Sequence, residues 1–179
     1  MQIPSKRECF YILEMLESGL IDYSYLVPWA DRIITGLKSA PPWLGTLAMK
    51  RYTGDLRDAL REYVLSEPFE PWPEDIEKFH VACLWLRYKR RELSWATFLR
   101  LAGERLDAAN GDWDCETPYH YRNVYEDAYF TRESEEQTKE DYLADHDLRS
   151  WIALAKEKFE PLRQLRWADK ANPSEERDP

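Results

Sequence analysis

The scarcity of glycine is the feature that most constrains the fold of this chain. Only six of the 179 residues are glycine. Strands joined by tight turns need residues with positive φ, which glycine or an Asn-Gly pair usually supplies. The one such pair, Asn110-Gly111, is not flanked by alternating apolar residues. The sequence therefore predicts a helical protein.

Apolar residues recur at helical spacing, and capping residues divide them into segments. Ser5 and Glu8 have the spacing of a capping box for a first helix, and Gly19 marks the expected end of that helix. Further helices are expected to start near Pro28, Pro41-Pro42, Thr53, Pro73, Ser94, Thr117, Ser134 and Asp147. These boundaries predict an all-α fold, a compact irregular or orthogonal bundle of about seven to nine helices, in which any strands are minor.

One segment of the chain is a candidate internal boundary. Residues 66–73 contain three prolines in eight residues and cannot form regular structure. Phe69 and Trp72 suit a packed loop better than a free linker, and 179 residues suit one domain. We expect a single helical domain over residues 1–171, with a possible sub-boundary at 66–73. Residues 172–179 are polar and are expected to form a flexible tail.

The cysteines and the apolar runs indicate where the chain resides. The three cysteines are far apart and have no metal-binding spacing. The first residues lack the apolar run of a signal peptide, and no stretch reaches the ~18 apolar residues of a membrane span. We expect a cytoplasmic protein with no metal, no cofactor and no membrane contact.

Negative charge is concentrated in one part of the sequence. Between Glu104 and Asp147 there are 14 acidic and four basic residues, a net charge of −10. Outside this stretch, 20 acidic residues meet 21 basic ones, so the net charge of −9 arises from the acidic stretch. Large aromatic residues lie within it. Acidic residues steer a basic partner towards a surface and aromatic residues anchor it, so this pattern indicates a binding surface.

The candidate partner-binding residues come from the first half of the acidic stretch. They are Asp112, Trp113, Asp114, Glu116, Tyr119, Tyr121, Glu126 and Asp127. Two alternatives remain open. Tyr121 and Tyr125 share a helical spacing with Val124 and Ala128 and can equally be core residues, while Tyr119 and Tyr129 are expected at or near the surface. The carboxylates can equally form a solvated face that gives solubility.

No motif in the sequence specifies a reaction. Residues 112–116 have a carboxylate at every second position, as the start of an EF-hand calcium loop does. Such a loop requires glycine at its sixth position and glutamate at its twelfth, where this sequence has Thr117 and Asn123. His80 is expected to be a hydrogen-bonded core histidine, and His120 and His146 lie beside residues that face other directions on a helix. Nucleophile, zinc-protease and phosphate-loop motifs are missing. The sequence therefore favours a protein that is not an enzyme.

Nucleic acid is not an expected partner. Arg87, Lys89, Arg90 and Arg91 form one short basic cluster, but the pI of the chain is about 5.0. Nucleic-acid-binding domains usually have a pI above ~9. A basic helix end that pairs with nearby acidic residues is the favoured interpretation of this cluster.

Three segments resemble a known class of proteins. They are residues 28–34 (PWADRII), residues 41–44 (PPWL) and residues 84–93 (LWLRYKRREL). They resemble small, acidic, helical bacterial immunity proteins that are encoded beside polymorphic or contact-dependent toxins. The resemblance implies a cytoplasmic protein that binds and blocks one cognate toxin domain. These families share neither a fold nor fixed contact residues, so the resemblance assigns no role to any single position.

The leading expectation is thus a non-catalytic immunity protein whose 104–147 region covers a basic surface of a toxin domain. A nuclease is the natural target, because a nuclease needs a basic rim to hold phosphate. One alternative is a small metal-dependent or acid/base enzyme that uses His120, His146 and nearby carboxylates. Another is an adaptor or subunit of a cytoplasmic complex.

Overall fold

The structure is a computed structural model that describes residues 3–109, 114–145 and 148–166. All regular secondary structure in these ranges is helical. The nine helices in these ranges are α1 (Lys6–Glu17), α2 (Tyr23–Thr35), α3 (Pro42–Met49), α4 (Thr53–Val64), α5 (Ile76–Lys89), α6 (Trp95–Asp107), α7 (Glu116–Asp127), α8 (Arg132–Asp145) and α9 (Leu148–Leu165). The same ranges contain no strand. The predicted all-α bundle is therefore confirmed.

Capping residues start and end several helices where the sequence predicts. The Ser5 backbone N–H donates to Glu8 Oε2 over 2.8 Å, and the Glu8 N–H donates to Ser5 Oγ over 3.2 Å, so the capping box forms. Ser94 Oγ accepts from the Thr97 N–H at the start of α6. Gly19, with a φ of 74°, follows the end of α1. Local side-chain chemistry is sufficient at these positions.

Two proline-based boundaries are wrong. Pro28 lies inside α2, because Asp22 Oδ1 accepts from the Ser24 N–H over 2.8 Å and starts the helix earlier. Pro73 is buried in the loop before α5, which begins at Ile76. Asp75 has a φ of 59°, outside the helical region, so α5 begins only after it. The Trp72 ring of the loop lies 4.2 Å from the Phe10 ring.

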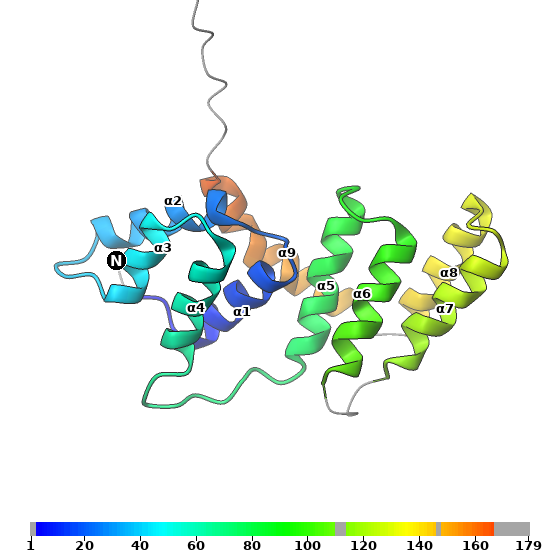
Figure 1. Cartoon of the computed structure of the whole chain (residues 1–179), viewed down its shortest axis with the longest axis horizontal. Coiled ribbons are helices and arrows are strands. Elements are labelled where there is room, and N and C mark those ends of the chain that lie inside the picture. The colour runs from blue at the N-terminus through cyan, green and yellow to red at the C-terminus, as the bar shows by residue number, and fades with distance from the viewer. Residues whose placement is uncertain (1–2, 110–113, 146–147, 167–179) are drawn as a thin grey trace, which may run out of the picture.

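The helices pack in two groups, and α9 connects them. Helices α1 to α4 form one group through the pairs α1–α4, α2–α3 and α3–α4. Helices α5 to α8 then lie side by side in chain order, so α7 and α8 form the end of the molecule farthest from α1–α4 (Figure 1). Helix α9 returns to contact α1, α2 and α5.

The proline-rich segment 66–73 is anchored to α1. Lys6 is buried, and its Nζ donates to the carbonyl oxygens of Ser66 and Pro68, the latter over 2.6 Å. The buried apolar residues on both sides of this segment belong to one hydrophobic cluster. The predicted flexible tail, 172–179, lies outside the described residues, as does the helix start expected at Asp147.

Candidate functional site

The predicted partner-binding residues do not form one cluster. Asp112 and Trp113 lie outside the described residues. Asp114 and Glu116 are at the N-terminal end of α7, while Glu126 and Asp127 are at its C-terminal end. At a rise of 1.5 Å per residue, these two pairs are roughly 15 Å apart along the helix. The prediction thus combined two separate ends of α7.

Asp114 has a structural function at the start of α7. Its Oδ1 accepts hydrogen bonds from the backbone N–H groups of Glu116 and Thr117, each over 3.1 Å, and Thr117 Oγ1 donates to its Oδ2. The helix therefore begins at Glu116, before the predicted cap at Thr117. A carboxylate at a helix N-terminus also interacts favourably with the helix dipole. Asp114 consequently contributes to folding as well as to surface charge.

Tyr119 packs closely against α6. A Cβ atom placed on Gly103 would lie 2.7 Å from Tyr119 ring atoms, so the absence of a side chain at Gly103 allows this contact. The ring is only partly exposed. Burial, and then the charge of Asp107, raise the pKa of the Tyr119 hydroxyl. The sequence analysis did not connect Gly103 with Tyr119, because their contact joins two helices.

Tyr121 and Tyr125 are core residues, with 9% and 7% of their surface exposed. The Tyr121 ring meets the Tyr142 ring of α8 edge to face, with centroids 6.0 Å apart. Val124, which shares their predicted spacing, instead faces outward and is 40% exposed. Of the two interpretations of these tyrosines, core residues or binding residues, the structure supports the first. Tyr121 is buried.

Helices α7 and α8 have a large excess of acidic over basic residues. Together they contain nine acidic and three basic residues. On these two helices, five exposed carboxylates have no ion-pair partner among the described residues: Glu116, Glu126, Asp127, Glu133 and Glu140. Exposed carboxylates stay hydrated and so cost little to leave unpaired. This surface is available to a basic partner.

The turn between α7 and α8 exposes two large aromatic residues. Tyr129 is 89% exposed and Phe130 is 51% exposed. Both have positive φ values, 55° and 56°, which are unusual for bulky residues. The sequence analysis expected Tyr129 near the surface but gave no indication of this backbone conformation.

Glu135 connects α8 to α5 and α7 beside this turn. Its carboxylate accepts from the Tyr88 hydroxyl over 2.5 Å and from the Tyr125 hydroxyl over 3.3 Å. Burial, and then this carboxylate, raise the pKa of both hydroxyl groups. The three residues line a depression of about 510 Å³ that also reaches Lys89 and Arg91. They hold the α7–α8 pair in place.

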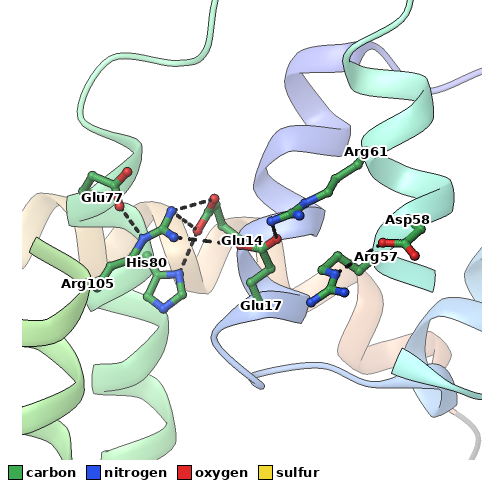
Figure 2. A network of polar contacts seen from close by, with 8 residues as sticks. All are labelled: Glu14, Glu17, Arg57, Asp58, Arg61, Glu77, His80 and Arg105. Carbon is green, nitrogen blue, oxygen red and sulfur yellow. Dashed lines mark hydrogen bonds and ion pairs between the residues drawn. The ribbon is translucent and has the colours of Figure 1, made fainter. Parts of the chain in front are cut away.

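A network of charged residues joins α1 to α4, α5 and α6 (Figure 2). Its centre is Glu14 of α1, which is 1% exposed. His80 Nδ1 of α5 lies 2.7 Å from Glu14 Oε2, and Arg105 Nη2 of α6 donates to both Glu14 oxygens over 3.1 Å. His80 is therefore the hydrogen-bonded core histidine that the sequence predicts.

The remaining members of the network extend from Arg105. Its Nε pairs with Glu77 of α5, and its Nη1 lies 3.9 Å from Glu17, which also pairs with Arg61 of α4 over 2.6 Å. Burial raises the pKa of the Glu77 carboxyl above its ordinary value, although Arg105 acts in the opposite direction. The network joins four helices, and each of its carboxylates has a cationic partner. Glu14 and His80 are buried, so the network contributes to the packing of α1 against these helices.

The described residues do not assemble the alternative enzymatic site. His120 is exposed and has no hydrogen bond to a described carboxylate, and His146 lies outside the described residues. Within the described ranges, no group of three or more His, Cys, Asp or Glu side chains could hold a metal ion. None of the described helices is both long and apolar enough to cross a membrane.

The basic cluster pairs with its own surroundings, as predicted for Arg87 and Arg90. Arg87 Nη1 donates to the Ser18 carbonyl over 2.6 Å, and Arg90 Nη2 lies 2.7 Å from Glu92 Oε1. These contacts join the end of α5 to the end of α1 and to the α5–α6 turn.

No protein-family model, curated protein or solved structure matches this chain.

Proposed function

We propose that this chain is a non-catalytic binding protein that neutralises a basic protein domain, as an immunity protein does with its toxin. The observation that supports the proposal is the separation of charge between the two parts of the molecule. The α7–α8 end carries a net charge of −6 and contains exposed carboxylates that no described basic residue neutralises. An uncompensated charge of this kind attracts a partner of opposite sign and accelerates its association.

The position of Glu126 and Asp127 further supports binding over solubility. Both are in the last turn of α7, which has no basic residue. The C-terminal end of a helix carries partial negative charge, so acidic side chains there oppose folding. A solubility function would be served equally well at positions where negative charge does not oppose the helix. In the last turn of α4, by contrast, the acidic Glu62 is offset by the neighbouring Arg61. Residues that break a local rule without such compensation mark candidate functional positions.

A growth experiment tests the proposal. The polypeptide encoded next to this chain is produced in a bacterial host, alone and together with this chain. Alone it should stop growth, and co-production of this chain should restore growth. The variant E126K/D127K should restore growth less well, because charge reversal slows the capture of a basic domain.

A matched control separates position from charge. The variant D31K/E62K reverses the same number of charges at exposed positions on α2 and α4, and Glu62 is also in the last turn of its helix. This variant should restore growth as the unmodified chain does. A neighbouring polypeptide that does not harm growth, or whose toxicity this chain leaves unchanged, would contradict the proposed function.

A further inference from the structure

The turn between α7 and α8 has the same hydrogen-bond pattern as the turn after α1, but a different residue at its critical position. After α1, the Gly19 N–H donates to the Leu16 carbonyl and the Leu20 N–H to the Met15 carbonyl, over 3.0 and 2.9 Å. This is a Schellman motif, in which glycine is preferred because the residue adopts a left-handed conformation.

In the turn after α7, Tyr129 occupies the position of that glycine. Its N–H donates to the Glu126 carbonyl over 2.8 Å, and the Phe130 N–H donates to the Tyr125 carbonyl over 3.0 Å. A left-handed conformation costs an L-residue other than glycine roughly 1–2 kcal/mol. With 89% of its surface exposed, the Tyr129 side chain regains little of this cost by packing within the chain.

Contacts with α7 and α8 support the backbone of the turn. The Phe130 ring meets the Tyr125 ring edge to face, with centroids 5.2 Å apart. The Tyr125 hydroxyl lies 3.3 Å from both the Phe130 carbonyl oxygen and Glu135 Oε2. An aromatic side chain presented on a fixed backbone loses little conformational entropy on binding, and so is an effective anchor.

The charges around the turn define the partner. Glu126, Asp127 and Glu133 are exposed beside it, while the basic Arg132 is paired with Glu136 over 3.2 Å. The residues that flank the turn in sequence are therefore mainly acidic, and the bases Lys89 and Arg91 border the depression that Tyr125 and Glu135 line. A second copy of this chain would place the same acidic face opposite the turn, and an anionic membrane or nucleic acid would be repelled. A cationic protein surface is complementary.

We propose that Tyr129 and Phe130 are the anchor of the binding surface, and that they insert into an apolar pocket bordered by basic residues on a cationic protein partner. The inference rests on the proposed function for the sign of the partner's charge. It adds the location and chemistry of the contact. Interface anchors are typically aromatic residues surrounded by a polar rim, and the acidic residues beside the turn form such a rim.

Selection of random peptides displayed on phage, with the immobilised full-length chain as the target, tests the anchor without the biological partner. The enriched peptides should be cationic and contain an aromatic or aliphatic residue. Their affinity should fall by about tenfold or more in Y129A, which corresponds to about 1.4 kcal/mol. Circular dichroism should show that Y129A remains folded, since the side chain is exposed.

Y52A is the matched control, because Tyr52 is 72% exposed and lies at the start of α4, which packs with α1 and α3 and not with α7 or α8. It should leave the affinity of the same peptides unchanged within about twofold. Three outcomes would overturn the proposal that Tyr129 is an anchor. They are a selection that enriches no peptide, a selection that enriches neutral or acidic peptides, and an affinity that falls by less than about tenfold in Y129A. The growth experiment distinguishes the two proposals. If Y129A restored growth as well as the unmodified chain does, Tyr129 would not be an anchor, and the proposed function would still hold.

Discussion

The two acidic regions of this molecule use their carboxylates in opposite ways. Glu14, Glu17 and Glu77 lie in the buried or partly buried network, where each has an arginine or histidine partner. Glu126 and Asp127 lie on the α7–α8 surface and have no partner among the described residues. Buried carboxylates must be paired to be tolerated, whereas exposed ones need no partner for stability. The first region therefore holds helices together, and the second is free to serve binding.

The largest expected effect tests the structural half of this comparison. E14Q keeps the size of the side chain but removes the charge that faces Arg105 and His80. Removal of one partner from a buried ion pair leaves the others uncompensated and costs roughly 3 kcal/mol or more. Urea unfolding should therefore show a lower free energy of unfolding by about this amount.

The exposed Glu62 provides the control for this measurement. E62Q should change the free energy of unfolding by less than about 0.5 kcal/mol. If E14Q were as stable as E62Q, the network would not hold α1 against α5 and α6, and the contrast between the two regions would fail.

A smaller effect distinguishes the Schellman turns after α1 and after α7. G19A should lower the free energy of unfolding by about 1–2 kcal/mol, because the left-handed residue loses the freedom of glycine. Its new Cβ would also lie 3.0 Å from Arg87 Nη1. Y129G should instead raise the free energy of unfolding by about 0.5–1 kcal/mol, since relief of the strained φ exceeds the entropy that glycine adds to the unfolded chain.

Y129A is the control for the second substitution. It removes the aromatic ring but keeps a residue for which a positive φ is unfavourable, so its stability should stay close to that of the unmodified chain. Thermal unfolding of the three variants checks the comparison. If Y129G were destabilised as much as G19A, the ring of Tyr129 would stabilise the fold, and its interpretation as a binding residue would be wrong.

Much of the fold could be predicted from the sequence because local chemistry specifies it. Ser5 with Glu8 and Ser94 are caps whose donors lie three residues away, and a sequence pattern contains all that is needed. Pro73 misled the prediction because Asp75 has a left-handed φ of 59° and delays the start of α5 to Ile76. The loop before α5 also contacts Phe10, 62 residues distant in sequence, through Trp72. Such contacts have no local signature.

The candidate site was predictable only in part. The concentration of acidic residues was visible in the sequence, but not the capping function of Asp114 or the burial of Tyr121. The left-handed Tyr129 could not be predicted, since residue preference favours glycine at that position. The buried network had one available signal: Glu14 interrupts an apolar run between Leu13 and Met15. A charged residue in such a run indicates a buried ionic contact.

The most direct test of the central claim measures stability and binding in one variant, E126K/D127K. Lysine at the C-terminal end of α7 should raise the free energy of unfolding by about 0.3–1 kcal/mol per residue, because it complements the helix dipole. The same variant should associate with the selected cationic peptide roughly tenfold more slowly at an ionic strength of about 0.01 M. The difference should narrow as salt increases, whereas D31K/E62K should associate at the unmodified rate. A variant that is less stable yet associates at the unmodified rate would show that Glu126 and Asp127 serve folding, and would contradict the account.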